Sequence, residues 1–182
     1  MSQQQDTVLI ITGPPGSGKT TVARLLTEKR GLAAHLESDL FWHFIARGYV
    51  EPWKPESHKQ NTVIMEIVAN AAARYAHAGY FTVIDGIIIP RWFFEPLRDA
   101  LTIAGLRVSY AILRPSLSIT IERATIRPST QLADRSVIEH LWNDFSDLDE
   151  AFEGHLIDSS RLTAKETASV IEERLCLGTL AV

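Results

Sequence analysis

The stretch ITGPPGSGKTTVARLL, residues 11–26, decides the fold class of this 182-residue chain. Residues 7–12 (TVLIIT), which overlap the start of this stretch, are apolar and β-branched, and this pattern predicts a buried strand. The three glycines of the stretch allow positive φ and close approach, and its two prolines stiffen the turn. A helix is predicted over residues 18–30. The stretch is therefore typical of a loop whose amides curl around an anion at a helix N-terminus.

The motif Gly13-x-x-x-x-Gly18-Lys19-Thr20 fits the phosphate-loop spacing residue for residue. Lys19 is expected to reach the β- and γ-phosphates of a nucleotide, and the Thr20 hydroxyl to bind Mg²⁺. An ordinary glycine-rich turn is the alternative, but the strand before the motif and the helix after it make a chance match less plausible. We therefore predict that the chain binds a nucleotide with Mg²⁺. The predicted nucleotide-binding residues are Gly13, Pro14, Pro15, Gly16, Ser17, Gly18, Lys19, Thr20, Thr21 and Arg123.

Composition narrows the class of protein. The chain is 46% hydrophobic and 22% charged with a net charge of −4, so nothing indicates a nucleic-acid-binding surface. No apolar run approaches membrane-spanning length, and residues 1–6 lack the features of a signal peptide. The single cysteine, Cys176, excludes an intramolecular disulfide and is expected to be a small buried residue near the last helix. We expect a cytoplasmic monomer or homodimer, with no nucleic-acid or membrane partner.

Strand and helix patterns alternate along the chain, with no repeat or linker, so we predict one domain over residues 1–182. The predicted strands are 7–12, 33–38, 80–86, 106–113 and 155–160. The predicted helices are 18–30, 39–48, about 57–78, about 91–104, 116–126, about 136–152 and a last one after Thr163, which with Glu166 forms a capping box. Alternation of this kind indicates an α/β fold with a parallel sheet covered on both faces.

Two aspartates follow predicted strands. A carboxylate that faces a phosphate site is disfavoured by like charge, so Asp39 there would need a function such as contacting a metal ion or accepting the proton of a hydroxyl. A role as N-cap of the next helix explains Asp39 equally well. Asp85 could hold a magnesium-bound water or orient a substrate, and a capping aspartate in a turn is its alternative. Ligands of parallel sheets bind beyond the carboxyl ends of the strands. The phosphate loop, Asp39 and Asp85 are therefore expected on one rim.

Two absences in the sequence weigh against other classes of nucleotide hydrolase. Gly86 follows Asp85 at the position where a mechanical ATPase would usually carry a glutamate that activates water. The chain also lacks the Asn-Lys-x-Asp segment with which signalling GTPases recognise their base.

Cations and aromatic side chains supply further candidates. Arg123 and Arg127 are four residues apart on one helix face, and Arg135 follows a polar segment that contains a proline. They could close over a triphosphate as charge stabilisers, with a short lid at about 127–136, or they could form a solvated helix face. Trp53 in a proline-bounded loop could wall a substrate pocket, and Arg91 could contact a polar or anionic substrate.

The chain resembles the P-loop small-molecule and nucleoside-monophosphate kinases. The segments that carry the resemblance are GPPGSGKTT (13–21), the pair Arg123 and Arg127, and the C-terminal stretch 155–175; LESDLFW (36–42) and VIDGIII (83–89) look closer to chloramphenicol phosphotransferase, gluconate kinase and zeta-toxin-type kinases. The resemblance implies a three-layer P-loop nucleoside triphosphate hydrolase fold with five parallel strands, helices on both faces and a short lid. It also implies ATP with Mg²⁺, Asp39 near the acceptor hydroxyl, and both arginines at the adenine or phosphates.

The sequence favours an ATP-dependent phosphotransferase that moves the γ-phosphoryl group to a hydroxyl of a small molecule. A nucleotide or nucleoside kinase is the alternative within enzymes, although Arg47, the possible monophosphate-binding arginine after Asp39, lies further along than the adenylate kinase pattern expects. An ATP-binding regulatory module without turnover is the alternative from another class. Intact Lys19, Thr20 and Asp39 favour an enzyme over such a module.

Overall fold

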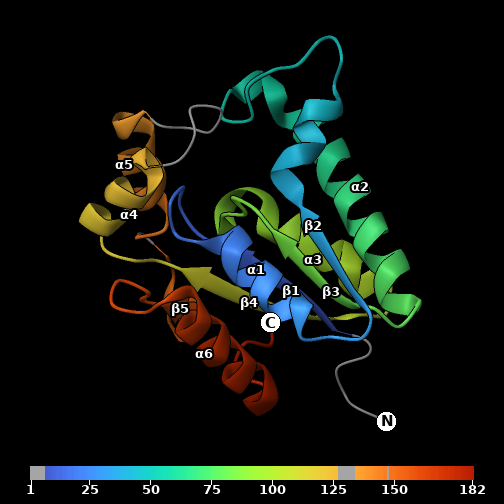
Figure 1. Cartoon of the computed structure of the whole chain (residues 1–182). Helices are drawn as coiled ribbons and strands as arrows, with labels where there is room; N and C mark the ends of the chain where they lie inside the picture. Colours follow the sequence, from blue (N-terminus) through green and yellow to red (C-terminus); the bar gives the residue numbers. More distant parts are fainter. Residues whose placement is uncertain (1–6, 127–133, 147) are drawn as a thin grey trace.

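The structure, a computed structural model, describes residues 7–126, 134–146 and 148–182. Five parallel strands form one sheet, as predicted, and their order is β2-β3-β1-β4-β5 (Figure 1). The strands are β1 (Thr7–Thr12), β2 (Ala33–Glu37), β3 (Phe81–Asp85), β4 (Arg107–Leu113) and β5 (Leu156–Ile157). The α-helices are α1 (Lys19–Glu28), α2 (His58–His77), α3 (Glu95–Ile103), α4 (Leu117–Thr125), α5 (Arg135–Asp144) and α6 (Ala164–Leu177).

The central strand β1 shows why both faces of the sheet are covered. Its side chains alternate between two cores, as the period of a strand requires. Val8 and Ile10 belong to the core shared with α2 and α3, whereas Leu9 and Ile11 belong to the core shared with α1 and α6. All four are completely buried. Helices on both faces of the sheet give the three-layer P-loop fold expected from the sequence.

The register of β1, β2 and β3 brings their carboxyl ends to one edge of the sheet, here called the rim. Ile11 of β1 pairs with Asp85 of β3, and Glu37 of β2 pairs with the same residue from the other side. The phosphate loop leaves β1 at this edge, and η1 (Ser38–Phe44), a 3₁₀-helix, leaves β2 there. The predicted common rim of the phosphate loop, Asp39 and Asp85 is therefore present.

Several predicted boundaries are wrong. Residues 39–48 do not form one helix, because η1 is 3₁₀ and ends at Phe44, as expected of a tight helix used in short pieces. The helix expected over 91–104 starts as η3 (Pro90–Phe94), a π-helix, before α3. The helix expected over 136–152 stops at Asp144, in a segment of serine and aspartate that compete with helical hydrogen bonds. Two further 3₁₀ turns are η2 (Pro55–Ser57) and η4 (Glu150–His155).

The last helix begins as predicted and corrects one burial prediction. Thr163 and Glu166 form the capping box of α6. Cys176 is exposed, contrary to expectation, because it lies five residues after the buried Ile171 and so turns away from the sheet. Within the described ranges, no helix is both long and apolar enough to cross a membrane.

Candidate nucleotide and phosphoryl-transfer site

The phosphate loop is held in shape by close backbone packing. A Cβ on Gly13 would lie 2.1 Å from the Leu113 carbonyl oxygen, and one on Gly16 would lie 2.4 Å from that of Thr120. Two of the loop glycines are thus needed where the loop packs against the end of β4 and against α4. Gly18 has φ +94° but no neighbour within 4 Å of a built Cβ, so it is the glycine that faces open space.

Lys19 curls back over the loop. Its Nζ donates to the carbonyl oxygens of Gly13 at 2.9 Å and Pro14 at 3.2 Å. The side chain of Ser17 is buried, and its Oγ makes no hydrogen bond within the described part of the chain. A buried hydroxyl without a partner and an ammonium among carbonyl groups are features of a site that fits an anion.

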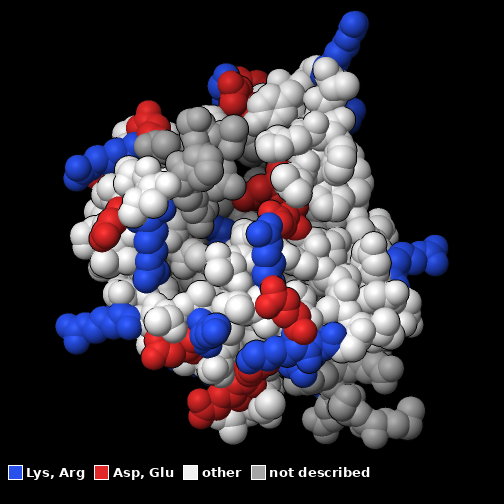
Figure 2. Space-filling model, in the orientation of Figure 1, with Lys and Arg blue, Asp and Glu red and all other residues white. Residues whose placement is uncertain are grey.

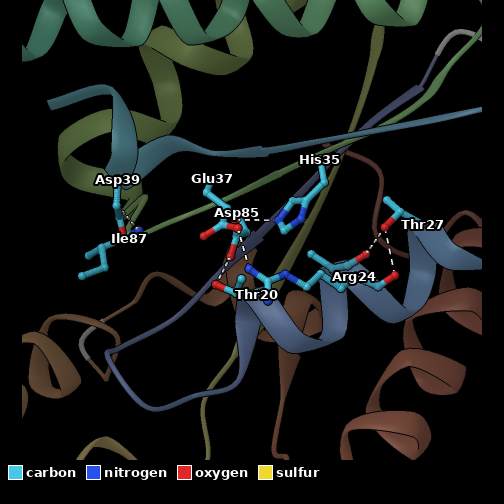
Figure 3. A network of polar contacts seen from close by, with 9 residues as sticks. Thr20, Arg24, Thr27, His35, Glu37, Asp39, Asp85 and Ile87 are labelled. Atoms are coloured by element: carbon cyan, nitrogen blue, oxygen red, sulfur yellow. Dashed lines mark hydrogen bonds and ion pairs between the residues drawn. The ribbon is translucent and has the colours of Figure 1, made fainter. Parts of the chain in front are cut away.

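Thr20 and Asp85 form a hydrogen-bonded pair beside the loop. The Thr20 hydroxyl, in the first turn of α1, donates to Asp85 Oδ2 at 2.6 Å. The other carboxylate oxygen of Asp85 lies 2.9 Å from His35 Nε2 (Figure 3). Asp85 is only 2% exposed, so both of its oxygens are committed to neighbours in a buried position. This arrangement suits a fixed acceptor that orients Thr20 better than it suits a group that collects a proton from a substrate.

Sequence reasoning missed His35. The strand period places His35 and Glu37 on the same face of β2, but the contact with Asp85 depends on how β2 pairs with β3, which the sequence pattern does not reveal. Glu37 in turn pairs with Arg24 of α1 at 2.9 Å. That ion pair is largely solvent-exposed, so it orients side chains more than it stabilises the fold.

Asp39 lies at the start of η1, facing the segment after β3 (Figure 3). Its Oδ1 accepts a long hydrogen bond, 3.4 Å, from the Ile87 amide. Surrounding protein removes bulk water from the carboxyl group and raises the pKa of Asp39, while the positive charge of Lys19 opposes this rise. Asp39 as a residue is nevertheless exposed, so the rise in its pKa is moderated by solvent and the group lies in an open hollow rather than in the core. Figure 2 shows acidic side chains gathered at a hollow in the middle of one face.

Gly86 brings η1 and β3 together. A Cβ on Gly86 would lie 1.9 Å from Ser38 Oγ and 3.0 Å from Asp39 Oδ1. Any side chain here would displace Asp39. The glycine that departs from the pattern of mechanical ATPases is therefore a packing requirement of this rim.

The predicted cations are not brought together by the described structure. Arg123 donates from Nη2 to the Ser159 carbonyl oxygen at 3.2 Å. Arg135 is exposed and pairs with Glu139 of its own helix at 2.8 Å. Arg127 and most of the predicted lid, 127–133, lie outside the described residues, as does the side chain of Arg91.

The predicted nucleotide-binding and substrate residues otherwise lie at or near this rim. Thr21 is exposed on the first turn of α1. Trp53 is 55% exposed and lines a pocket with residues of α2 and η3. In the described part of the chain, no cluster of three or more His, Cys, Asp or Glu side chains could hold a metal ion by itself. A divalent ion at Thr20 and Asp85 would thus need oxygens from a bound nucleotide or water.

A family model described as an AAA domain matches residues 8–150, a span that includes the phosphate loop, Asp39, Asp85 and Arg123. The chain belongs to this AAA domain family. Membership implies nucleotide binding, as the phosphate-loop motif predicted. No curated protein matches the chain.

Solved structures resemble this AAA domain over nearly its whole length. A tunicamycin resistance protein from Deinococcus radiodurans matches with TM-score 0.70 and 20% identity, covering 93% of this chain and 95% of its own. A sugar kinase from Janibacter matches with TM-score 0.69 and 21% identity, covering 93% of each chain. A gluconokinase from Sinorhizobium meliloti matches with TM-score 0.64 and 16% identity, covering 97% and 99%. These likenesses confirm the predicted resemblance to small-molecule kinases at the level of the fold.

Proposed function

We propose that this chain is a single-domain, ATP-dependent phosphotransferase that moves the γ-phosphoryl group of ATP to a hydroxyl of a small molecule. The observation that carries the proposal is the placement of Asp39. A carboxyl group with a raised pKa lies on the same rim as an intact phosphate loop and within the electrostatic influence of Lys19. A hydroxyl acceptor needs such a group, whereas ATP binding alone does not.

Phosphoryl transfer depends on positioning and charge stabilisation more than on covalent help. In the proposal, the loop residues 13–18 and the first turn of α1 hold the phosphates through backbone amides. Lys19 leaves the carbonyl oxygens of Gly13 and Pro14 and turns its ammonium to the β- and γ-phosphates. Its present hydrogen bonds to carbonyl groups support this role, since a phosphate is the stronger acceptor for an ammonium.

Asp39 is the proposed base. It accepts one long hydrogen bond from Ile87, and it lies at the start of a segment that leaves the sheet toward the acceptor side. A pKa raised toward the working pH favours proton transfer from an alcohol as the new bond to phosphorus forms. Asp85 is assigned a different role, because its two oxygens already hold Thr20 and His35.

Mg²⁺ fits the pair formed by Thr20 and Asp85, since hydroxyl and carboxylate oxygens are ligands that this ion accepts. Thr20 would bind the ion and Asp85 would hold one of its waters; the ion would neutralise charge on the phosphate oxygens. Arg123, Arg127 and Arg135 remain proposed charge stabilisers near the nucleotide. Of these, Arg123 has the best support, because it already bridges α4 to the loop after β5.

The two alternatives make different predictions. A nucleotide or nucleoside kinase would bind an acceptor that carries a base, and one that acts on a monophosphate would need cations around the acceptor. A regulatory module would bind ATP but would yield neither ADP nor a phosphorylated product.

The test is a screen of pooled hydroxylated metabolites with ATP and Mg²⁺, read by mass spectrometry for products that have gained one phosphoryl group. We expect at least one such product with the wild-type protein and none with Lys19→Ala. ATP binding with no product in any pool would favour the regulatory module. ADP formation at one rate regardless of the pool would indicate a simple ATPase.

A further inference from the structure

A pocket of about 350 Å³ lies between the segment 52–58, the first half of α2 and η3. Its walls are unusually rich in large apolar side chains for a region open to solvent: Trp53, Met65, Trp92 and Phe93. Trp53 is 55% exposed and Trp92 is 38% exposed. Two tryptophan side chains left partly in water at one pocket form a surface suited to a ring-shaped ligand.

Two structural links connect Asp39 to the pocket, one through η1 and one through the segment after β3. In a 3₁₀-helix residues i and i+3 lie above one another, so Asp39 and Trp42 share a face of η1. The Trp42 ring lies 6.0 Å from that of Phe93, which lines the pocket. The second link runs through Ile87, whose amide donates to Asp39. Ile87 lies in the short connection that leads to η3. Asp39 and the aromatic residues of the pocket are therefore linked both through η1 and through the connection from β3 to η3.

Buried polar contacts hold the pocket in shape. Asn61 is 6% exposed and accepts from Trp42 Nε1 at 3.0 Å. Its amide nitrogen donates to the Pro52 carbonyl oxygen at 2.8 Å and to Ser57 Oγ at 2.7 Å. One side chain of α2 thus fixes both η1 and the loop that carries Trp53. A preformed pocket loses less conformational entropy when a ligand binds.

Few charged side chains line the pocket in the described structure. Among the described lining residues, Lys54 and His58 are those with titratable side chains. The Lys54 ammonium pairs with Glu51 at 2.8 Å, so it is already partly neutralised. The described side chains do not include that of Arg91 in η3, so the pocket is characterised by its apolar walls.

We infer that the acceptor of the proposed reaction carries an apolar or aromatic ring, and that this ring binds between Trp53 and Trp92 while a neighbouring hydroxyl reaches Asp39. Only the placement of the hydroxyl at Asp39 rests on the proposed function; the binding of the ring between Trp53 and Trp92 does not. The inference narrows the substrate class from any small alcohol to a ring-bearing one, and it sets compact acyclic polyols aside.

A larger apolar pocket, of about 780 Å³, serves as the internal comparison. It is lined by Phe41 and Phe44 of η1 and by Val63 and Ile67 of α2. The 3₁₀ period places Phe41 and Phe44 on a different face of η1 from Asp39 and Trp42, although Ile45, which also lines this pocket, follows in line with Trp42. Asp39 itself lines neither pocket, so the binding test compares the two.

The test uses two glucosides that differ only in the group on the anomeric oxygen: phenyl β-D-glucoside, which carries an aromatic ring, and methyl β-D-glucoside, which does not. Binding is measured by saturation-transfer NMR titration of the full chain without ATP, so that the readout is independent of catalysis. Trp53→Ala is the test variant. Ile67→Ala is the matched control, because both side chains are about half exposed and neither change should disturb the fold.

We expect the phenyl compound to bind measurably more tightly than the methyl compound. Trp53→Ala should weaken its binding about two- to tenfold, the range for loss of one aromatic contact, and Ile67→Ala should leave it unchanged. Equal affinity for both sugars, no binding of either, or loss of binding only in Ile67→Ala would overturn the inference. If the phenyl compound binds as expected but no compound in the metabolite pools is phosphorylated, the proposed function fails and the pocket assignment stands.

Discussion

Replacement of Gly86 by alanine tests how tightly the rim is built. The added Cβ would meet Ser38 Oγ at 1.9 Å and Asp39 Oδ1 at 3.0 Å, and no real Cβ contact is as short as the first. Gly86 cannot easily move, because its amide donates to the Ile11 carbonyl oxygen at 3.3 Å and its own carbonyl accepts from Thr12 at 3.0 Å. The Ser38 hydroxyl must therefore rotate away or the start of η1 must shift.

Overpacking of this kind costs about 1–3 kcal/mol, which lowers Tm by roughly 2–12 °C for a chain of this size. Gly31→Ala is the control, because a Cβ there meets nothing within 4 Å and its φ lies outside the positive range. That change should be neutral or raise stability by up to about 1 kcal/mol through the unfolded state. Both variants are compared with the wild type by thermal and denaturant unfolding.

A double mutant identifies the clash. Ser38→Ala removes the hydroxyl that a Cβ at position 86 would strike, so it should recover part of the stability lost in Gly86→Ala. The coupling between the two changes should be at least about 0.5 kcal/mol, as for residues in direct contact. If Gly86→Ala were as stable as Gly31→Ala, the close approach of η1 to β3 would be refuted.

Four further predictions follow from the site. Lys19→Ala should leave Tm nearly unchanged but weaken ATP binding severely in a calorimetric titration; unchanged affinity would remove Lys19 from the phosphate site. Asp39→Asn should lower turnover by about 10²–10⁴-fold with ATP affinity nearly intact, whereas Asp85→Asn should raise the Mg²⁺ concentration needed for half-maximal rate; the reverse pattern would exchange their roles. Because the pKa of Asp39 is raised above 3.8 in the folded protein, ionisation of this group destabilises the fold. Asp39→Asn should therefore raise Tm slightly at neutral pH, since the residue is exposed, and this gain should shrink as pH falls through the raised pKa and be gone at about 3.8; a gain independent of pH would contradict this. Asn61→Ala should cost about 1–3 kcal/mol in urea unfolding by leaving buried groups unpaired, while the exposed Asn70→Ala on the same helix should cost little, and equal effects would count against the proposed bracing of the pocket.

The fold was predictable because its signals are local. The apolar run before Gly13 and the alternation of strand and helix patterns indicated a parallel sheet, and the phosphate-loop motif placed its functional edge. Helix boundaries such as the early end of α5 at Asp144 were not predictable, because marginal helices depend on tertiary packing.

The site was only partly predictable. The common rim of the phosphate loop and Asp85 was predictable, since β1 and β3 are neighbouring parallel strands that end there. The hydrogen bond between Thr20 and Asp85 was not predicted. The contact of His35 with Asp85 depends on the register between β2 and β3, which no local pattern reveals. The aromatic pocket around Trp53 likewise joins segments about 40 residues apart, so its composition emerges only from the folded chain.

The central claim, transfer of the γ-phosphoryl group to an organic hydroxyl, is tested most directly by turnover in water enriched in ¹⁸O. The protein is incubated with ATP, Mg²⁺ and a pool of ring-bearing hydroxylated compounds, and every phosphate-containing product is analysed by mass. The account predicts a phosphorylated organic product without ¹⁸O, because its bridging oxygen comes from the acceptor. Inorganic phosphate carrying one ¹⁸O as the sole product, with or without the pool, would show that water is the acceptor and would contradict the account.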